Sequence, residues 1–194
     1  MSMEAWGDFK MKPQKFKKLQ TKHLDLKPLP VTFKLASEIF DIISNNRDYY
    51  KFLPWSNVKQ PEQEFAFLSD ADKNWKNQSE ATYGMYLRKD GSFAGVCTMF
   101  DIDWDKESSE FGYWLNIKYA GHGLMSEAVK AISNEFFNMG FKRIVIKANP
   151  ENFASCKVAE KCGFEREGIL RSYDFLPTLN KREDIALYAK IKEK

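Results

Sequence analysis

The 194-residue sequence has few of the residues that build disulfide frameworks or metal centres. Its three cysteines are Cys97, Cys156 and Cys162, without a Cys-x-x-Cys pair, and its two histidines are His23 and His122. An odd number of cysteines without close pairs argues against a disulfide framework and fits a reducing compartment. So few thiols and imidazoles also argue against a structural zinc site, and we expect no metal.

Long apolar runs and a strong charge excess are missing as well. No stretch approaches the roughly 20 apolar residues of a membrane span, and the N-terminus lacks the apolar core of a signal peptide. We therefore expect a cytoplasmic protein. The formal net charge of +3 is too small to indicate nucleic-acid binding. Much of the excess lies in a lysine cluster within residues 1–22, which we interpret as a solvated basic extension before a domain spanning residues 23–194.

Hydrophobic periodicity predicts a mixed α/β fold for the rest of the chain. Apolar residues spaced by three, four and seven predict a helix within 31–50, and Pro61 suits the first turn of a second helix. The period then changes to two, with a strong turn at Lys89–Ser92. The pattern predicts strands over residues 83–88, 93–100, 109–116, 141–148, 164–173 and 184–192.

A glycine-containing loop, Lys118–Gly123, separates the third strand from a helix that ends at Gly140. Glycines let the backbone approach a ligand closely. The free N–H groups and the dipole of the helix start then favour a pyrophosphate. Two glycines alone are equally compatible with a structural loop. A P-loop would need a Gly-Lys-Ser/Thr sequence, and a dinucleotide fingerprint would need a third glycine where Ser126 stands.

The order of several segments resembles the GCN5-related N-acetyltransferase (GNAT) superfamily, and more closely its RimJ/RimL-type branch, which acetylates N-termini of bacterial ribosomal proteins. The resemblance covers roughly residues 80–192. The segments that carry it are Glu110–Asn116, Gly121–Ala128, Arg143–Ile144, Asn152–Ser155, Glu160–Phe164 and Glu167–Gly168. The resemblance implies a mostly antiparallel sheet of about six to seven strands, flanking helices and a splayed central strand pair.

The resemblance also implies acetyl-CoA as the acetyl donor. The splayed strand would bind the pantetheine arm, the glycine loop and helix start would bind the pyrophosphate, and Asn152 would bind pantetheine amides or cap a short helix. His122 is a candidate phosphate contact. The implied donor-binding residues are Tyr113, Trp114, Leu115, Asn116, Lys118, Gly121, His122, Gly123, Leu124, Met125, Ser126, Asn152 and Ser155.

The chemistry is attack of an amine on a thioester, and the resemblance suggests three catalytic candidates. Ser155 would polarise the carbonyl or donate to the sulfur, because the tyrosine that many members place seven residues after Asn152 is Ala159 here. The base of the branch falls on Asp174, and Glu110 at the start of the splayed strand is a competing candidate. An α-amino group, with a pKa near 8, needs only a mild base, which can act through water.

The acceptor is less well defined by the sequence. The predicted acceptor pocket consists of the aromatic residues Trp55, Tyr50, Trp104 and Tyr173. Exposed aromatic residues would also suit the interface of a homodimer. We expect a protein N-terminus of the ribosomal-protein type as the acceptor. A small-molecule acceptor, a polyamine, an amino acid or an antibiotic, remains open, and Asp101, Asp103, Asp105 and Glu107 could bind a polyamine. A non-catalytic acetyl-CoA-binding or ribosome-interaction protein is the alternative of another class.

Overall fold

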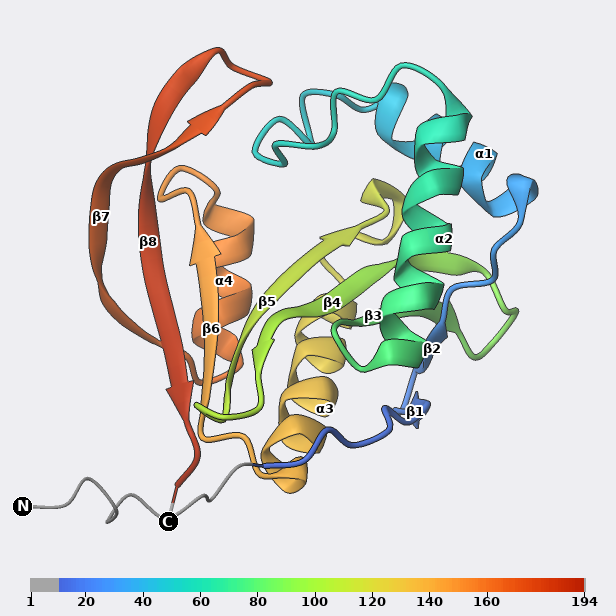
Figure 1. Ribbon diagram of the computed structural model, residues 1–194. Helices are drawn as coiled ribbons and strands as arrows, with labels where there is room; N and C mark the ends of the chain where they lie inside the picture. Colours follow the sequence, from blue (N-terminus) through green and yellow to red (C-terminus); the bar gives the residue numbers. More distant parts are fainter. Residues whose placement is uncertain (1–10, 194) are drawn as a thin grey trace, which may run out of the picture.

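The computed structural model describes residues 11–193, and Figure 1 shows one twisted sheet with helices on both faces. The eight strands follow the order β1-β2-β3-β4-β5-β6-β8-β7, and every neighbouring pair is antiparallel except β5 and β6. The strands are β1 (Leu19–Gln20), β2 (Leu24–Pro28), β3 (Ala81–Leu87), β4 (Phe93–Asp103), β5 (Ser108–Leu115), β6 (Arg143–Ala148), β7 (Glu165–Leu176) and β8 (Lys181–Ile191). The predicted mixed, mostly antiparallel α/β fold is confirmed.

The sheet is larger than the expected six to seven strands because β1 and β2 had not been predicted. Only two leucines mark β2, Leu24 and Leu26, and charged residues flank both of them. The leucines pair with Leu87 and Met85 of β3, and both are fully buried. A strand of five residues that ends in Pro28 has too short an apolar pattern to stand out from a loop.

Within residues 11–193 the sheet is accompanied by four α-helices: α1 (Phe33–Ser44), α2 (Pro61–Asn77), α3 (Leu124–Met139) and α4 (Phe153–Lys161). The helix expected within residues 31–50 is shorter than predicted. It begins after the N-cap Thr32, whose hydroxyl accepts from the Leu35 N–H, and ends at Ser44 before a series of turns. One core lies between α1, α2 and the sheet, and a larger core lies between α3 and the opposite face. None of the helices within residues 11–193 has the length and hydropathy of a membrane span.

Part of the basic N-terminal extension belongs to the larger core. Phe16 is buried, and its ring lies 5.4 Å from Trp75, 5.8 Å from Phe136 and 6.4 Å from Trp104. The lysines at 12, 15, 17, 18 and 22 are exposed, as expected for a solvated segment, whereas Lys10 lies outside the described residues. The segment from residue 11 onward is therefore packed through one aromatic residue and solvated through its lysines.

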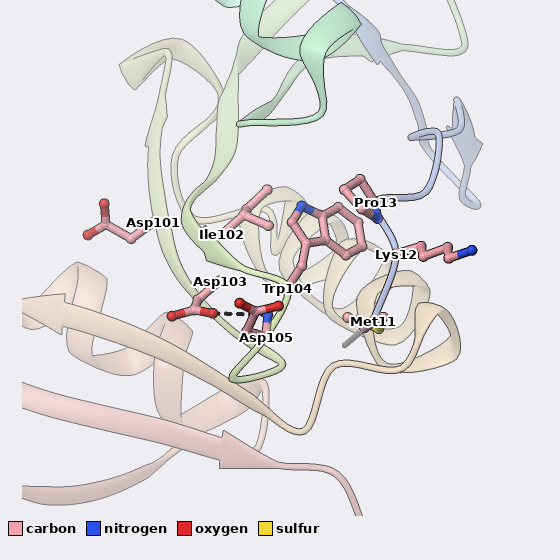
Figure 2. Close-up of a pocket in the computed structure, with 8 residues that line it drawn as sticks. All are labelled: Met11, Lys12, Pro13, Asp101, Ile102, Asp103, Trp104 and Asp105. Carbon is pink, nitrogen blue, oxygen red and sulfur yellow. Dashed lines mark hydrogen bonds between the residues drawn. The ribbon is translucent and has the colours of Figure 1, made fainter. Parts of the chain in front are cut away.

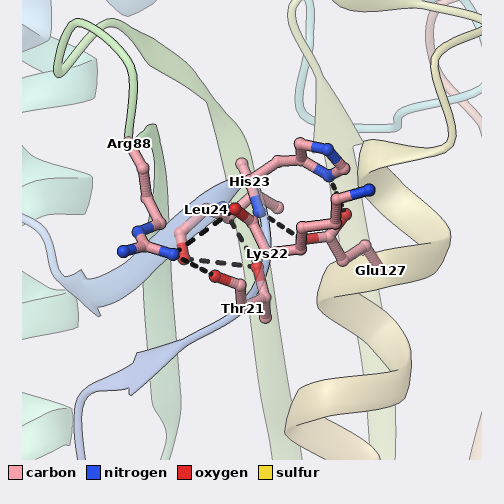
Figure 3. Close-up of polar contacts among 6 residues, drawn as sticks. All are labelled: Thr21, Lys22, His23, Leu24, Arg88 and Glu127. Carbon is pink, nitrogen blue, oxygen red and sulfur yellow. Dashed lines mark hydrogen bonds and ion pairs between the residues drawn. The ribbon is translucent and has the colours of Figure 1, made fainter.

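The end of this extension is tied to the first turn of α3 (Figure 3). The Glu127 carboxylate accepts from the backbone N–H of His23 at 2.8 Å and lies 2.7 Å from the His23 Nδ1 atom. Arg88 donates from its side chain to the Thr21 carbonyl at 3.0 Å. Partial burial alone would raise the pKa of Glu127, but the hydrogen bonds from Thr21 and His23 outweigh it and lower that pKa.

We expect Glu127→Gln to lower the free energy of unfolding at pH 7 by about 0.5 kcal/mol, the range of partly solvated ion pairs. The depressed folded pKa means that the stabilisation is present above the unfolded carboxyl pKa, about 4.3, and is lost as the pH falls through the folded value. Urea unfolding between pH 3 and 8 measures this dependence. The matched variant Glu165→Gln, at an exposed strand position, should show no pH-dependent difference. A constant deficit for Glu127→Gln down to pH 3 would contradict the carboxylate's role.

Candidate active site

A cleft of about 1320 Å³ opens where β5 and β6 diverge. Figure 1 shows the loop between α1 and α2 on one side of this region and the β7–β8 hairpin on the other. The cleft walls come from the α1–α2 loop, the start of α2, β4, β5, the glycine loop, α4 and the hairpin. The predicted donor half and acceptor half are therefore parts of one continuous cavity.

The divergence of β5 from β6 follows from a short parallel register. Ser108, Ser109 and Glu110 pair with Arg143, Ile144 and Val145, and the pairing ends there. From Phe111 to Leu115, β5 pairs with β4 alone. Its other edge therefore presents backbone N–H and C=O groups to the cleft, where an extended chain with amide groups can add as a further strand. The expected splayed strand pair is confirmed.

The glycine loop has the geometry of an anion cradle. Gly121 and Gly123 have φ angles of +82° and +76°, which residues with a β-carbon rarely adopt. A β-carbon at either position would meet no atom within 4 Å. Gly123 is the N-cap of α3, and the first helical hydrogen bond joins the Glu127 N–H to the Gly123 carbonyl. The preceding N–H groups of α3 lack an acceptor within the helix and favour an anion.

Most of the predicted donor-binding residues line this cleft, and three do not. Asn116 accepts from the Lys118 N–H at 3.1 Å and caps a short turn, Ile117–Tyr119. The Lys118 ammonium lies 5.1 Å from the centre of the Tyr119 ring. The His122 Nδ1 atom lies 3.3 Å from the Tyr119 carbonyl. The residues that line the cleft are Tyr113, Trp114, Leu115, Gly121, Gly123, Leu124, Met125, Ser126, Asn152 and Ser155.

The Ser155 hydroxyl has a partner that the sequence did not indicate. Its Oγ atom lies 3.1 Å from the Tyr113 hydroxyl, which also donates to the Ser155 carbonyl at 3.2 Å. Burial raises the pKa of Tyr113, although the bond with Ser155 opposes that rise, so the phenol stays protonated as a donor. Asn152 caps α4, as predicted, by accepting from the Ser155 N–H at 3.3 Å. A strand residue and a helix residue thus place two hydroxyls together in the cleft wall.

The two predicted bases have different surroundings. The Glu110 carboxylate forms an ion pair with the Lys147 ammonium at 2.8 Å. Burial raises the pKa of Glu110, whereas the Lys147 partner lowers it. Lys147 also donates to the Tyr173 hydroxyl at 3.3 Å. Asp174 lies exposed on β7, and its carboxylate accepts from the N–H of Phe175 at 2.7 Å. Both carboxylates line the cleft, and only Glu110 is held by a cation.

Two buried carboxyl groups in the cleft wall had not been singled out from the sequence. Glu183 of β8 is 6% exposed and accepts from the Asn149 amide at 2.6 Å. Glu64 of α2 is 3% exposed, and burial raises its pKa to about 7. The signal for Glu64 was its spacing of four and seven from Leu68 and Ala71, which puts a carboxyl on the buried face of the helix.

The aromatic residues of the predicted acceptor side that line the cleft come from the α1–α2 loop and from β7, and they lie near β5. Tyr50 is buried, and its hydroxyl donates to the Leu115 carbonyl at 3.0 Å and accepts from the Ile117 N–H at 3.2 Å. This pair of bonds fixes the loop to the end of β5. Trp55 is 45% exposed, with its ring 6.2 Å from that of Trp114. Tyr50, Trp55 and Tyr173 all line the cleft.

The prediction for Trp104 was wrong, because this residue lies outside the cleft. It lines a separate shallow hollow with Met11 and Asp103, which Figure 2 shows. Its ring packs 5.1 Å from Phe141, and its indole N–H donates to the Gln78 carbonyl at 3.3 Å. The β4–β5 turn carries Trp104 to the end of the sheet opposite the glycine loop, so the aromatic ring completes the core.

We expect Trp104→Ala to lower the free energy of unfolding by about 2 to 3 kcal/mol, somewhat below the range for fully buried tryptophans. The KM for the amine acceptor should stay within twofold, because the residue does not line the cleft. Denaturant unfolding and steady-state kinetics measure the two effects. Trp55→Ala is the matched variant. It should raise the KM for the amine acceptor and leave the free energy of unfolding nearly unchanged. A raised acceptor KM in Trp104→Ala at unchanged stability would contradict the core assignment.

Comparison with known proteins identifies the family. A family model described as an acetyltransferase (GNAT) domain matches residues 25–165. The chain belongs to this GNAT family. It is an N-acetyltransferase, and acetyl-CoA is its acetyl donor.

Curated relatives include one that agrees with the resemblance to the RimJ/RimL-type branch and one that is named for another acceptor. A ribosomal-protein-serine acetyltransferase of Escherichia coli (strain K12) is 28% identical over 155 residues, covering 79% of this chain and 85% of the relative. A spermidine N(1)-acetyltransferase of the same organism is 28% identical over 136 residues, covering 69% and 70%. The GNAT fold is therefore shared with relatives that are named for different acceptors.

Solved structures share the fold over nearly the whole chain. The microcin C7 self immunity acetyltransferase MccE, in complex with acetyl-CoA and AMP, aligns with a TM-score of 0.80 at 24% identity, covering 95% of this chain and 100% of that one. RimL, the ribosomal L7/L12 alpha-N-protein acetyltransferase in complex with coenzyme A, aligns with a TM-score of 0.79 at 22% identity, covering 88% and 95%.

Proposed function

We propose that this GNAT acetyltransferase acetylates the N-terminal α-amino group of a protein, with ribosomal proteins as the acceptor class. Two relatives support this acceptor by their names. One is the ribosomal-protein-serine acetyltransferase of Escherichia coli, and the other is a putative ribosomal N-acetyltransferase of Bacillus subtilis (strain 168), 27% identical over 154 residues. The observation on which we base the choice is that three of the six carboxyl groups lining the cleft, Glu80, Glu110 and Glu183, already have partners within the protein, which leaves fewer of them for a polyamine.

A polyamine site needs several carboxylates in the same cavity, and the acidic stretch does not provide them. Of Asp101, Asp103, Asp105 and Glu107, only Asp101 lines the cleft. Asp103 forms an ion pair with Lys106 at 2.9 Å in the β4–β5 turn. Glu107 lies 3.8 Å from the Lys142 ammonium. These residues neutralise local cations at the far end of β4 and β5. The spermidine-acetylating relative keeps the polyamine acceptor as the second candidate.

The arrangement of residues supports direct transfer. Acetyl-CoA supplies a thioester, and the amine nitrogen attacks its carbonyl carbon as the carbon–sulfur bond breaks. We propose that the Ser155 hydroxyl donates a hydrogen bond to the charge that develops on the carbonyl oxygen or the leaving sulfur, while the Tyr113 hydroxyl donates its one proton to Ser155. Their mutual bond at 3.1 Å orients the pair. Cys156 is not proposed as a nucleophile, because its Sγ atom lies 3.8 Å from the Asn149 carbonyl and within residues 11–193 no histidine or carboxylate bonds to it.

A turnover screen with acetyl-CoA tests the proposal. The acceptors are peptides with N-terminal serine or alanine, the same peptides with a blocked N-terminus and an internal lysine, spermidine, and an aminoglycoside. We expect the free N-terminal peptides to have the highest kcat/KM and the blocked peptides to be inactive. Higher kcat/KM for spermidine would favour the polyamine alternative. Tight acetyl-CoA binding without turnover of any amine would favour a non-catalytic binding protein.

A further inference from the structure

Glu64 stands out among the charged residues of the cleft because it is buried and has no partner. It lies in the first turns of α2 and is 3% exposed. No hydrogen bond or ion pair joins its carboxyl group to another residue in the described part of the chain. A buried carboxylate without a partner is costly to retain unless a ligand supplies one.

Glu64 lines the cleft together with several apolar residues. It shares the cleft wall with Val58, Phe67 and Val96, which pack in or against the core between α1, α2 and the sheet. Burial raises its pKa to about 7, and no nearby charge opposes that effect. At neutral pH the group therefore exists in both protonation states, which is the condition for accepting and releasing a proton.

The other carboxylates of the cleft are occupied or solvated. Glu110 is paired with Lys147, and Glu183 accepts from Asn149. Glu80 accepts from the Asn74 amide at 3.2 Å. Asp101 and Asp174 are exposed, as are Lys157 and Lys161, the cations that α4 contributes to the wall. The titratable hydroxyls nearest in the chain are those of Tyr49 and Tyr50, in the loop that precedes α2.

We propose that Glu64 binds the ammonium group of the acceptor and takes its first proton. This inference rests on the proposed function and assigns the amine position within the cleft. The ammonium transfers one proton to the Glu64 carboxylate, which leaves a neutral amine and a carboxylic acid. The amine nitrogen then forms the bond to the thioester carbon, its second proton passes to the departing thiolate, and the carbon–sulfur bond breaks. Glu64 afterwards releases its proton to solvent, so the overall reaction releases one proton.

The pKa of the carboxyl group matches an α-amino group better than a lysine side chain. An α-amino group has a pKa near 8, so transfer of its proton to a carboxylate with a pKa of about 7 is unfavourable by about tenfold. A lysine side chain has a pKa near 10.4, and transfer of its proton to the same carboxylate is unfavourable by more than a thousandfold. An apolar wall also favours the neutral amine–acid pair over the ion pair. Glu64 thus provides a physical basis for preferring a protein N-terminus over an ε-amino group.

The kinetic test compares Glu64→Gln with Glu62→Gln, its neighbour on the same helical turn, which is exposed and lies outside the cleft. With an N-terminal serine peptide, we expect Glu64→Gln to lower kcat/KM for the peptide about 100-fold and to remove the limb near pH 7 from its pH profile. The Kd for acetyl-CoA should stay unchanged and the Tm should not fall, because the substitution removes a buried carboxylate that has no partner. Glu64→Asp should restore part of the rate. Glu62→Gln should stay within twofold.

The outcomes separate this inference from the proposed function. Wild-type turnover of the peptide together with an unaffected Glu64→Gln variant would overturn the inference and leave the function standing. A tenfold loss in Asp174→Asn or Glu110→Gln, with none in Glu64→Gln, would also overturn it in favour of those carboxylates. Absence of wild-type turnover would overturn the function itself. In that case, NMR titration of carbon-13-labelled Glu64 decides the inference: the carboxyl pKa should fall when the peptide and coenzyme A are added, and an unchanged pKa would overturn it.

Discussion

Gly123→Leu is expected to weaken acetyl-CoA binding about 100-fold, which corresponds to about 2.7 kcal/mol. Gly123 has a φ of +76°, is exposed and caps the N-terminus of α3. A leucine there would project into the space where the free N–H groups of the helix start meet the pyrophosphate. Isothermal titration calorimetry with acetyl-CoA measures the loss.

Gly91→Leu is the matched control for this substitution. Gly91 has nearly the same φ, +73°, and a β-carbon there would likewise meet no atom within 4 Å, but it lies in the hairpin between β3 and β4. Both variants should therefore be destabilised similarly, by about 1 to 2 kcal/mol, through the left-handed backbone. Only Gly123→Leu should lose affinity for acetyl-CoA. Equal affinities in the two variants would show that the loop does not hold the donor.

Ser155→Ala is expected to lower kcat about 100-fold while the Kd for acetyl-CoA changes by less than threefold. The hydroxyl would stabilise charge that develops during transfer, and removal of such a donor typically costs two to three orders of magnitude. Tyr113→Phe should have a similar effect, because it removes the partner that orients Ser155 at 3.1 Å. The double variant should be little worse than either single variant, since the two hydroxyls act as a unit. Single-turnover kinetics with the preferred amine measure the chemical step.

Tyr49→Phe controls for the loss of a phenol from the same cleft. Tyr49 lines the cleft, is 40% exposed and makes an edge contact with Tyr50 at 4.9 Å. Its variant should retain kcat within twofold. Multiplicative losses in the Ser155→Ala/Tyr113→Phe double variant would contradict a coupled pair and favour two independent roles.

The sequence predicted those parts of the fold that depend on local patterns. The turn at Lys89–Ser92, the cap at Asn152 and the end of α3 at Gly140 each depend on a few neighbouring residues, and all three are observed. The limits of the first helix were less predictable, because apolar and aromatic residues continue beyond Ser44 into turns. There, Tyr50 is held by bonds to Leu115 and Ile117, which are distant in sequence.

The site was predictable where the backbone defines it and less so where side chains from different elements meet. The glycine loop is a continuous segment, so a pattern could indicate it, whereas the splaying of the strand before it was implied by the resemblance to the GNAT superfamily. The bond between Ser155 and Tyr113 joins positions 42 residues apart. Glu64 could be recognised as unusual because it is a carboxyl group on an apolar helix face. Trp104 could be recognised because it is an aromatic ring in a polar turn. Which cavity each of them faces depends on long-range packing, which a local pattern does not contain.

The burial of Phe16 has a practical consequence for where the chain can be shortened. Removal of residues 1–22 would take away the lysines and also the ring that fills the space between Trp75, Trp104 and Phe136. The resulting void would destabilise the enzyme, so loss of activity in such a truncation would not identify a role of the lysines. Replacement of the exposed lysines by glutamine, with Phe16 retained, separates the electrostatics of the extension from its contribution to folding.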